Sequence, residues 1–282
     1  MYRRIVAAVN EYTNSEVAAR YALALARACR APLTLFFVAE AGMKAEAFRR
    51  AEAALGRLFR EAERQEIDVE SITERGEPFA KIRDAIERNR ADILFASTRR
   101  EDLEKRFFQR TLAKALILNL PCSVALVRVV HMGRVSPKNI LVPLRGRMVT
   151  IKEPSCFVAK LAEAFDAKIT LFHLAEPIAG YFHGAAHLAA LRRESGVPKD
   201  IESFAECLRR FDVTHEKKIR YGDIAREITI EAAHKRNDLI VMGASERSLV
   251  RSIMGGNPVE TVLRETPCNL IVFKPWLIAD RW

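Results

Sequence analysis

The chain has 282 residues, of which 49% are hydrophobic, and its formal net charge is +10. This apolar content excludes wholesale disorder, and charged residues interrupt every apolar run before it reaches the ~20 residues of a membrane span. The length predicts two domains of ordinary size. No known nucleic-acid motif accompanies the positive charge, so we expect a solvated basic surface, no specific nucleic-acid partner and no membrane partner.

The first half alternates short apolar runs with segments of helical periodicity. The first apolar run ends at Asn10, so we interpret it as a strand and expect no signal peptide. Strands are predicted at Ile5–Val9, Leu33–Val38, Asp68–Arg75, Ile93–Ala96 and Ser123–Val129. Helices are predicted at Ser15–Cys29, Ala45–Gln65, Phe79–Asn89 and Thr111–Asn119, because apolar residues recur there at helical spacing. Ser15 is expected to cap the first helix.

The second half repeats this order after a linker at His131–Pro137. Its strands are predicted at Ile140–Leu144, Ile169–Leu174, Val213–Arg220, Leu239–Met242 and Leu270–Phe273. Extra length falls within Pro177–Ile201, which we interpret as an enlarged loop and helix. Strands that alternate with helices predict parallel sheets with both faces covered.

The sequence itself is duplicated. Ala31–Glu40 reads APLTLFFVAE and returns at Ala167–Glu176 as AKITLFHLAE, while Pro121–Val127 returns at Pro267–Phe273. The period is far longer than the 20–50 residues of solenoid repeats. Each copy is therefore predicted to be a doubly wound α/β domain with a five-stranded parallel sheet. The fifth strands could pair with each other, which would make the chain an internal pseudo-dimer.

In such sheets, ligands bind beyond the carboxyl ends of the strands, at the point where the strand order reverses. If the first and fourth strands are neighbours, two loops of each copy face that crevice. They begin at Asn10 and Ala96 in the first copy, and at Arg145 and Gly243 in the second.

Two stretches of the second copy form a distinctive pattern. Asp238–Ser248 reads DLIVMGASERS and Met254–Val259 reads MGGNPV, and both are accompanied by Tyr221–Ala225 (YGDIA) and Thr266–Cys268 (TPC). These motifs resemble the universal stress protein family, and the resemblance covers nearly the whole chain as a tandem pair. It implies the adenine nucleotide alpha hydrolase-like fold, with one such domain at residues 1–131 and another at residues 137–282. Family members commonly dimerise through their fifth strands, which agrees with the internal pairing of the two copies, and a two-chain homodimer is expected as a further association.

The resemblance implies a nucleotide loop that reads Gly, two residues, Gly, nine residues, Gly, then Ser or Thr. Glycines let backbone N–H groups approach phosphates, and the following helix offers further amides. In the second copy Gly243 and Gly256 match, Glu246 replaces the second glycine, and Asn257 replaces the hydroxyl residue. This loop is partly kept.

The same resemblance places Arg145 where nucleotide-binding members hold the ribose with a carboxylate, and an apolar group beside the adenine. The nucleotide-binding set that the resemblance implies is Pro143, Arg145, Leu174, Met242, Gly243, Glu246, Gly256, Asn257, Pro258 and Val259.

The Glu246 carboxylate would repel a triphosphate, by about 1 kcal/mol at ~4 Å in water and about 4 kcal/mol at an effective dielectric of 20. Bound Mg²⁺ could reverse that effect. Alternatively, Arg145 and Glu246 form an ion pair that plugs the second pocket, or Arg145 contacts a phosphate directly.

The first copy departs further from the family pattern. We align Ala96 with the first glycine, Arg99 with the second and Gln109–Arg110 with the final pair, while Asn10 replaces the carboxylate. Since no glycine remains, the nucleotide loop of this copy is predicted to be lost. Arg99, Arg100 and Arg110 could attract an anion or form a solvated basic loop.

Cysteines and histidines carry weaker signals. None of the five cysteines forms a CxxC motif, and the equivalent Cys122 and Cys268 are predicted to be buried thiols, which suits a reducing, cytoplasmic location. Cys156 near a helix start could have a lowered thiol pKa or simply be packed. His183 and His187 could bind zinc with His173 or Glu176, or be ordinary surface residues.

Three functions follow as hypotheses. The first is a stress-response regulator that senses an adenine nucleotide, such as ATP with Mg²⁺, or another anion through the second domain. The second is an interaction scaffold for an unidentified protein client, with both pockets degenerate and no cofactor. The third is a slow ATP hydrolase, although no catalytic residue or metal-ligand set can be named.

Overall fold

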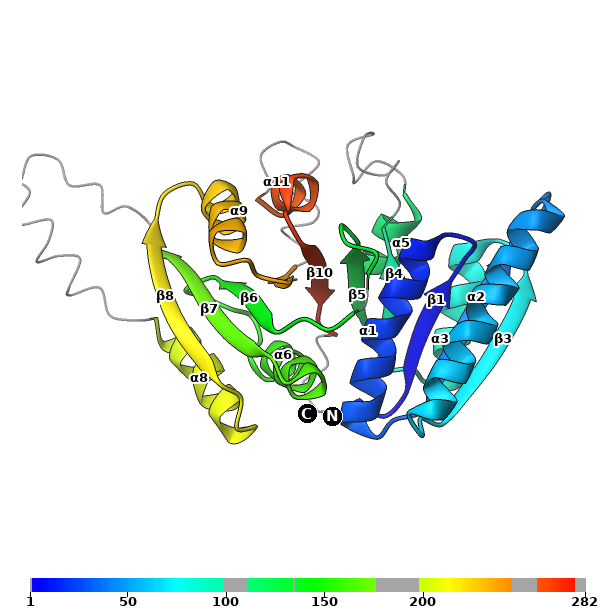
Figure 1. Cartoon of the computed structure of the whole chain (residues 1–282), viewed down its shortest axis with the longest axis horizontal. Helices are drawn as coiled ribbons and strands as arrows, with labels where there is room; N and C mark the ends of the chain where they lie inside the picture. The colour runs from blue at the N-terminus through cyan, green and yellow to red at the C-terminus, as the bar shows by residue number, and fades with distance from the viewer. Residues whose placement is uncertain (1, 99–110, 134, 176–197, 245–257, 277–282) are drawn as a thin grey trace, which may run out of the picture.

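The computed structural model describes residues 2–98, 111–133, 135–175, 198–244 and 258–276 (Figure 1). The elements of the first half are β1 (Ile5–Val9), α1 (Thr13–Cys29), β2 (Leu33–Ala39), α2 (Ala45–Arg64), β3 (Val69–Arg75), α3 (Pro78–Asn89), β4 (Ile93–Ser97), α5 (Leu112–Asn119) and β5 (Ser123–Arg128).

The second half follows the same order. Its elements are β6 (Asn139–Leu144), α6 (Lys152–Phe165), β7 (Lys168–Ala175), α8 (Lys199–Arg210), β8 (His215–Tyr221), α9 (Ile224–His234), β9 (Leu239–Gly243), α11 (Pro258–Glu265) and β10 (Asn269–Lys274). Every predicted strand is present, with ends that move by one or two residues. Within the predicted insertion, residues 177–197 lie outside the described residues.

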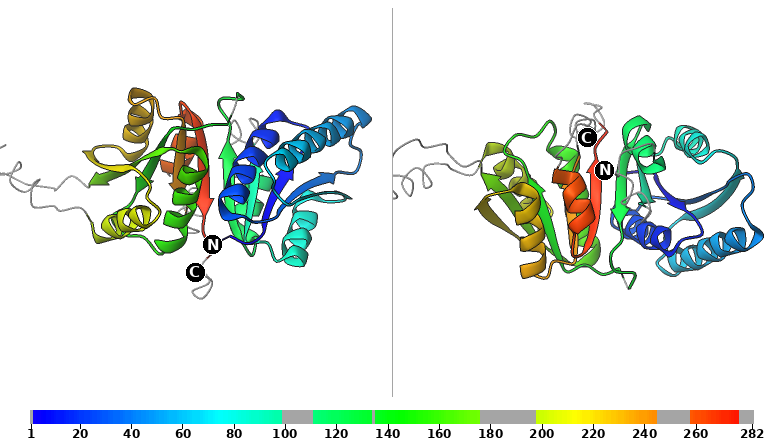
Figure 2. Two further views of the ribbon diagram at one scale, coloured as in Figure 1. Left: turned by 60° about the horizontal axis from the view of Figure 1, so that its bottom comes forward. Right: turned by 90° about the horizontal axis from the view of Figure 1, so that it is seen from above.

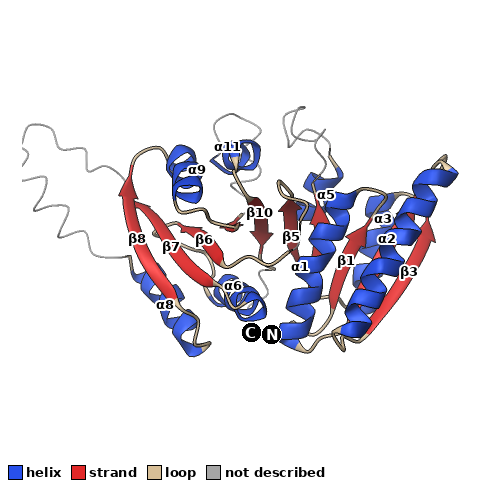
Figure 3. Cartoon of the chain, in the orientation of Figure 1, coloured by secondary structure: helices blue, strands red, loops and turns tan. Residues whose placement is uncertain are grey.

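The strands form one ten-stranded sheet in the order β3-β2-β1-β4-β5-β10-β9-β6-β7-β8. All neighbours within each half are parallel. Among the strands of the described residues, the single antiparallel pair is β5 with β10, centred on Leu126 opposite Val272. The predicted pairing of the fifth strands is therefore confirmed, and it relates the halves by an internal two-fold (Figure 3).

A hydrophobic core covers each face of this sheet. The core that includes Phe37, Phe157 and Phe204 lies beneath α1, α2, α6 and α8. The other core, with Ile82, Leu116 and Ile228, lies beneath α3, α5, α9 and α11 (Figure 2). Central strands such as β1, β4, β5, β9 and β10 alternate between the two cores, as period-two side chains require. Both predicted covered faces are confirmed.

The start of α1 differs from the prediction. The residue before the helix is Tyr12, and no side chain caps it. The Ser15 hydroxyl accepts the Asn10 backbone N–H at 3.0 Å and donates to the Tyr12 carbonyl. Ser15 therefore stabilises the turn from inside the helix and is not its cap, because the helix begins at Thr13, two residues earlier than predicted.

None of the helices in the described ranges combines the length and the apolar character that a bilayer crossing needs.

Candidate functional site

In the second half, the sheet opens between two neighbouring strands, β6 and β9. β6 aligns with β9 at two positions, Ile140 with Leu239 and Leu141 with Ile240. Yet β9 stays paired with β10 as far as Gly243, and β6 stays paired with β7 as far as Leu144. The two central strands thus separate before their carboxyl ends. This is the switch point of the strand order, where ligands of doubly wound sheets bind.

Arg145 and Gly243 lie on either side of this opening, as predicted from the sequence. Gly243 ends β9, and Arg145 directly follows β6. Continuing the β6–β9 register places Leu144 level with Gly243. Both Arg145 and Gly243 are exposed. A guanidinium and a bare stretch of backbone therefore lie at the predicted crevice, where β6 and β9 separate.

Three apolar residues of the predicted set share one face of the sheet. Met242 is buried in the core beneath α9 and α11, and Leu174 packs against the same core. Pro143 lies on the same face by strand alternation, and it is half-buried. Together they form an apolar surface at the carboxyl ends of β6, β7 and β9, of the kind that an aromatic base could cover.

Gly243 has room for a side chain. A Cβ atom built on this residue would meet no heavy atom within 4 Å, and its backbone is not in the left-handed region. Neither packing of the described residues nor backbone conformation requires glycine here. The open space beside Gly243 would allow a ligand to approach the backbone closely.

The remaining predicted site residues have mixed outcomes. Pro258 and Val259 begin α11, and Val259 is buried in the core. Glu246, Gly256 and Asn257 lie outside the described residues, so the Arg145–Glu246 plug stays a prediction.

The first half corrects one sequence alignment. Ile93 aligns with Ser123 just as Leu239 aligns with Asn269. The Thr98 N–H donates to the Val127 carbonyl at 3.0 Å, and the Ala244 N–H donates to the matching Phe273 carbonyl at 2.8 Å. Ser97, and not Ala96, therefore matches Gly243. The apolar run ends at Ala96, but the strand continues for one more residue because its ladder with β5 does.

This shift moves the whole first-copy loop by one residue. Counted from Ser97, the glycine positions fall on Arg100 and Arg110, which lie outside the described residues, and the final position falls on Thr111. Thr111 caps α5 by accepting the Lys114 N–H at 3.2 Å. The hydroxyl of the family pattern is thus present in the first copy, and only the strand register identifies it.

Asn10, at the ribose position of the first copy, is used within its own turn. Its side-chain oxygen accepts the Tyr12 N–H at 3.0 Å. This hydrogen bond closes a local turn and stabilises the conformation of the β1–α1 loop.

Cysteine and histidine predictions are resolved in part. Cys122 and Cys268 are buried free thiols, as predicted. The alternative of a lowered thiol pKa at Cys156 is wrong, because burial raises that pKa. The His173 ring nitrogen Nδ1 lies 3.1 Å from the Leu144 carbonyl. No potential metal-binding group of three ligands occurs among the described residues, and Glu176, His183 and His187 lie outside them.

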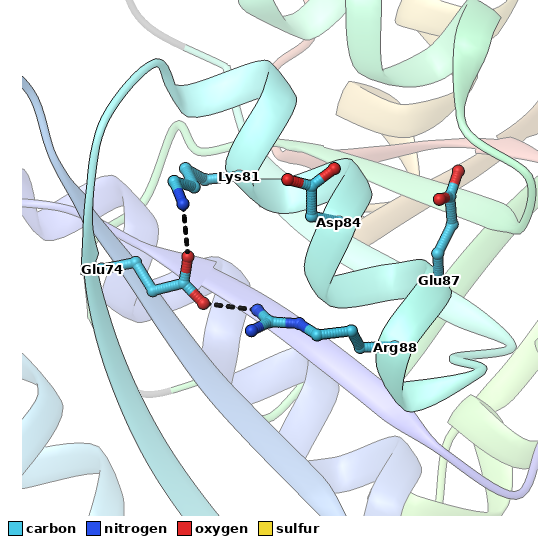
Figure 4. A pocket seen from close by; sticks show the side chains of 5 residues that line it. All are labelled: Glu74, Lys81, Asp84, Glu87 and Arg88. Atoms are coloured by element: carbon cyan, nitrogen blue, oxygen red, sulfur yellow. Dashed lines mark hydrogen bonds and ion pairs between the residues drawn. The ribbon is translucent and has the colours of Figure 1, made fainter.

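A pocket of about 340 Å³ lies far along the chain from this crevice, between the edge strand β3 and α3 (Figure 4). Its carboxylate Glu74 is bound by Lys81 at 3.2 Å and also by Arg88. Ionic hydrogen bonds from both cations hold the Glu74 pKa below its usual range, with that from Arg88 the larger. These charges are paired with one another, so we interpret the pocket as a solvated surface feature.

Known proteins match this arrangement. A sequence model of the universal stress protein family matches residues 1–128 and 138–274. A universal stress protein of Methanocaldococcus jannaschii is 28% identical over 143 residues, which are 49% of this chain and 82% of that protein.

Two solved structures share the full tandem architecture. A universal stress protein of Archaeoglobus fulgidus superposes with a TM-score of 0.64 at 14% identity, covering 96% of each chain. A putative universal stress protein of Pseudomonas aeruginosa gives 0.65 at 14% identity, covering 98% of this chain and 94% of that one. With two matched segments, a duplicated sheet and the adenine nucleotide alpha hydrolase-like fold, the chain belongs to the universal stress protein family as a tandem member.

Proposed function

We propose that this chain is a stress-response regulator whose second half senses an adenine nucleotide or a related anionic ligand. Family membership supports the general role. The crevice between β6 and β9 supports the site, because it combines an apolar face, an exposed cation and accessible backbone. We also propose that residues 1–131 and 137–282 act as separate domains, of which only the second retains such a site.

The observation that carries this proposal is the contrast between Ser97 and Gly243. These residues end matching strands in one fold, and the first half accommodates a side chain there. Glycine in the second half leaves an open cradle that the fold does not need. Close approach of a phosphate to backbone N–H groups would explain it.

Arg145 changes what the crevice can recognise. A guanidinium only donates hydrogen bonds, so it cannot accept from ribose hydroxyls as a carboxylate does. It matches phosphate oxygens in geometry and charge. We therefore assign Arg145 to the phosphates, the apolar face of Pro143, Leu174 and Met242 to the base, and Gly243 to the close backbone contact. Magnesium, where bound, would neutralise phosphate charge beside Glu246.

A second candidate function has support of its own. Arg145 and Glu246 are two substitutions of opposite charge on loops that leave the same edge of neighbouring strands. If they pair, the crevice is closed and the chain serves as an interaction scaffold for a protein client.

Titration of ATP into the wild-type chain and the Glu246→Gly variant separates these functions. The sensing function predicts measurable binding by the wild type and tighter binding by the variant, since a repulsive carboxylate is removed. The scaffold function predicts no wild-type binding, with binding that appears only in Glu246→Gly. Absence of binding in both proteins would overturn nucleotide sensing.

A further inference from the structure

The junction between the halves has two chemically different sides. On one side Asn269, the first residue of β10, accepts the backbone N–H groups of Val130 and His131 at 2.8 and 3.0 Å. Its amide nitrogen donates to the Tyr21 hydroxyl at 3.1 Å. A neutral amide thus fastens the chain that leaves β5 to the second half.

The internal two-fold places Ser123 and Trp276 at the matching positions on the other side. Ser123 begins β5, and its hydroxyl oxygen accepts the Trp276 backbone N–H at 2.9 Å. The serine side chain is shorter than that of asparagine, and on this side of the junction the Glu153 carboxyl supplies a second acceptor for the Trp276 N–H. Glu153 of α6 accepts the Trp276 N–H at 3.1 Å and the Tyr2 hydroxyl at 3.1 Å, and it also accepts the Ser123 hydroxyl.

Glu153 therefore joins three distant segments. Tyr2 precedes β1, Ser123 belongs to β5, and Trp276 follows β10, so both ends of the described chain meet on one carboxyl. Only 2% of Glu153 is exposed.

The fold does not require a carboxyl at this position. Counted back from the left-handed residues that end α1 and α6, Arg30 and Asp166, Glu153 matches Val17. Val17 is fully buried and apolar. Together with the neutral Asn269 across the junction, this shows that each half can be built and fastened without a buried acid.

Several ionisable groups surround Glu153. Those that interact with Glu153 itself are Tyr2, Asp92, Cys122 and Cys156. Three further groups interact with these neighbours: Cys29 with Tyr2, Lys160 with Cys156, and Lys274 with Cys122. Burial raises the Glu153 pKa to about 7, against the opposing effect of its three hydrogen bonds. Burial also raises the pKa of Tyr2 and of the three thiols, so these groups stay neutral where Glu153 titrates.

We propose that Glu153 is a proton-controlled latch that fastens the C-terminal segment at Trp276 to the first half of the chain. The protonated carboxyl fits the buried site, whereas the ionised carboxylate is more stable in water. Opening of the latch therefore becomes more favourable as the pH rises. Between about pH 4.5 and pH 7 the equilibrium constant for opening increases about tenfold per pH unit, because opening in this range is linked to loss of one proton, and above about pH 7 it stays constant.

Tryptophan fluorescence tests this latch directly, because both tryptophans, Trp276 and Trp282, lie in the last seven residues. In a Trp282→Phe background, Trp276 is the single emitter. We expect its emission to shift to the red as the pH rises from about 4.5 to about 7 and to change no further above that, as the indole leaves the junction and the Lys274 ammonium, 5.3 Å from its ring. Glu153→Gln should abolish this transition.

Glu163→Gln is the matched control, because Glu163 lies on the same helix but is 46% exposed and paired with Lys160. It should leave the transition unchanged. A transition that persists in Glu153→Gln, or a flat wild-type profile, would overturn the latch. If Glu153→Gln does not fold, hydrogen exchange of the wild-type Trp276 amide decides. After correction for intrinsic rates, its protection must fall between about pH 4.5 and pH 7, and constant protection over this range contradicts the proposal.

Discussion

Ser97 and Gly243 occupy one position of the duplicated fold, each as the last residue of its strand and each aligned with the matching residue of a fifth strand, Val127 or Phe273. The duplication thus provides an internal reference for the fold. What the first half accepts at this position, the second half can also accept. The glycine of the second half is therefore free of any structural requirement that the described residues impose.

Exchanging these residues tests that statement. Gly243→Ser should change the free energy of unfolding by no more than about 0.5 kcal/mol, because its new side chain enters open space at an exposed strand end. Urea denaturation of the variant and the wild type provides the measurement. Destabilisation by about 2 kcal/mol or more would show that the fold itself requires the glycine.

The role of Arg145 can be separated from that of Glu246. If Arg145 contacts a phosphate, Arg145→Gln should weaken ATP binding about tenfold or more, since hydrogen bonds to charged groups contribute about 1.5–3 kcal/mol. Calorimetric titration of Arg145→Gln, Glu246→Gln and the double variant checks this. A rise in affinity on Arg145→Gln would instead indicate that the two residues pair and block the crevice.

Phe157 is expected to be the most costly side chain to truncate at the junction. It is fully buried, stacks on Phe273 at 4.2 Å and also contacts Tyr2 and Phe95 from the first half. Phe157→Ala should lower the free energy of unfolding by about 3–5 kcal/mol. Chemical denaturation measures this loss, and a loss below about 1 kcal/mol would mean that the two halves do not share this core.

Stability should depend on pH through Glu153. Its pKa is raised from 4.5 to about 7 in the folded chain, so the unfolded chain loses its proton first. The stabilisation is present below about pH 4.5 and is lost as the pH rises to about 7, by about 3 kcal/mol in total. The difference between wild type and Glu153→Gln in urea denaturation across this range isolates the effect. An identical slope in both proteins would contradict it.

The buried thiols should resist alkylation. Burial raises the pKa of Cys122 to about 12 and that of Cys268 to about 11. At pH 8 the reactive thiolate of Cys122 is then about a thousandfold rarer than in a free cysteine. Mass spectrometry after iodoacetamide treatment of the folded chain should find both residues unmodified, and rapid labelling would show that the ends of β5 and β10 open readily.

The fold was largely predictable because it depends on regular patterns. Apolar runs such as Leu33–Ala39 are buried along their whole length, and duplicated turns fix which strands correspond. Pairing of β5 with β10 followed from two exposed apolar edges. The ends of elements were harder to predict. Ser97 is polar, and it belongs to β4 because it pairs with Val127 of β5, a contact that the periodicity of the sequence does not reveal.

The candidate site and the latch show which functional residues the sequence could place and which it could not. Arg145 and Gly243 could be placed because both follow apolar strands directly. Glu153 could not, because an acidic residue in the first turn of a helix is typical of a solvated, dipole-stabilising position. Only the packing of α6 against the other half, where Tyr2 and Trp276 donate hydrogen bonds to Glu153, reveals that this carboxyl is buried.

The central claim is that the second half keeps a ligand cradle that the first half has lost, and ATP affinity of Gly243→Ala tests it most directly. The account predicts that this variant folds with wild-type stability but binds ATP at least about tenfold more weakly, while Ser97→Gly binds as the wild type does. Undiminished binding by Gly243→Ala, or tighter binding by Ser97→Gly, would contradict it.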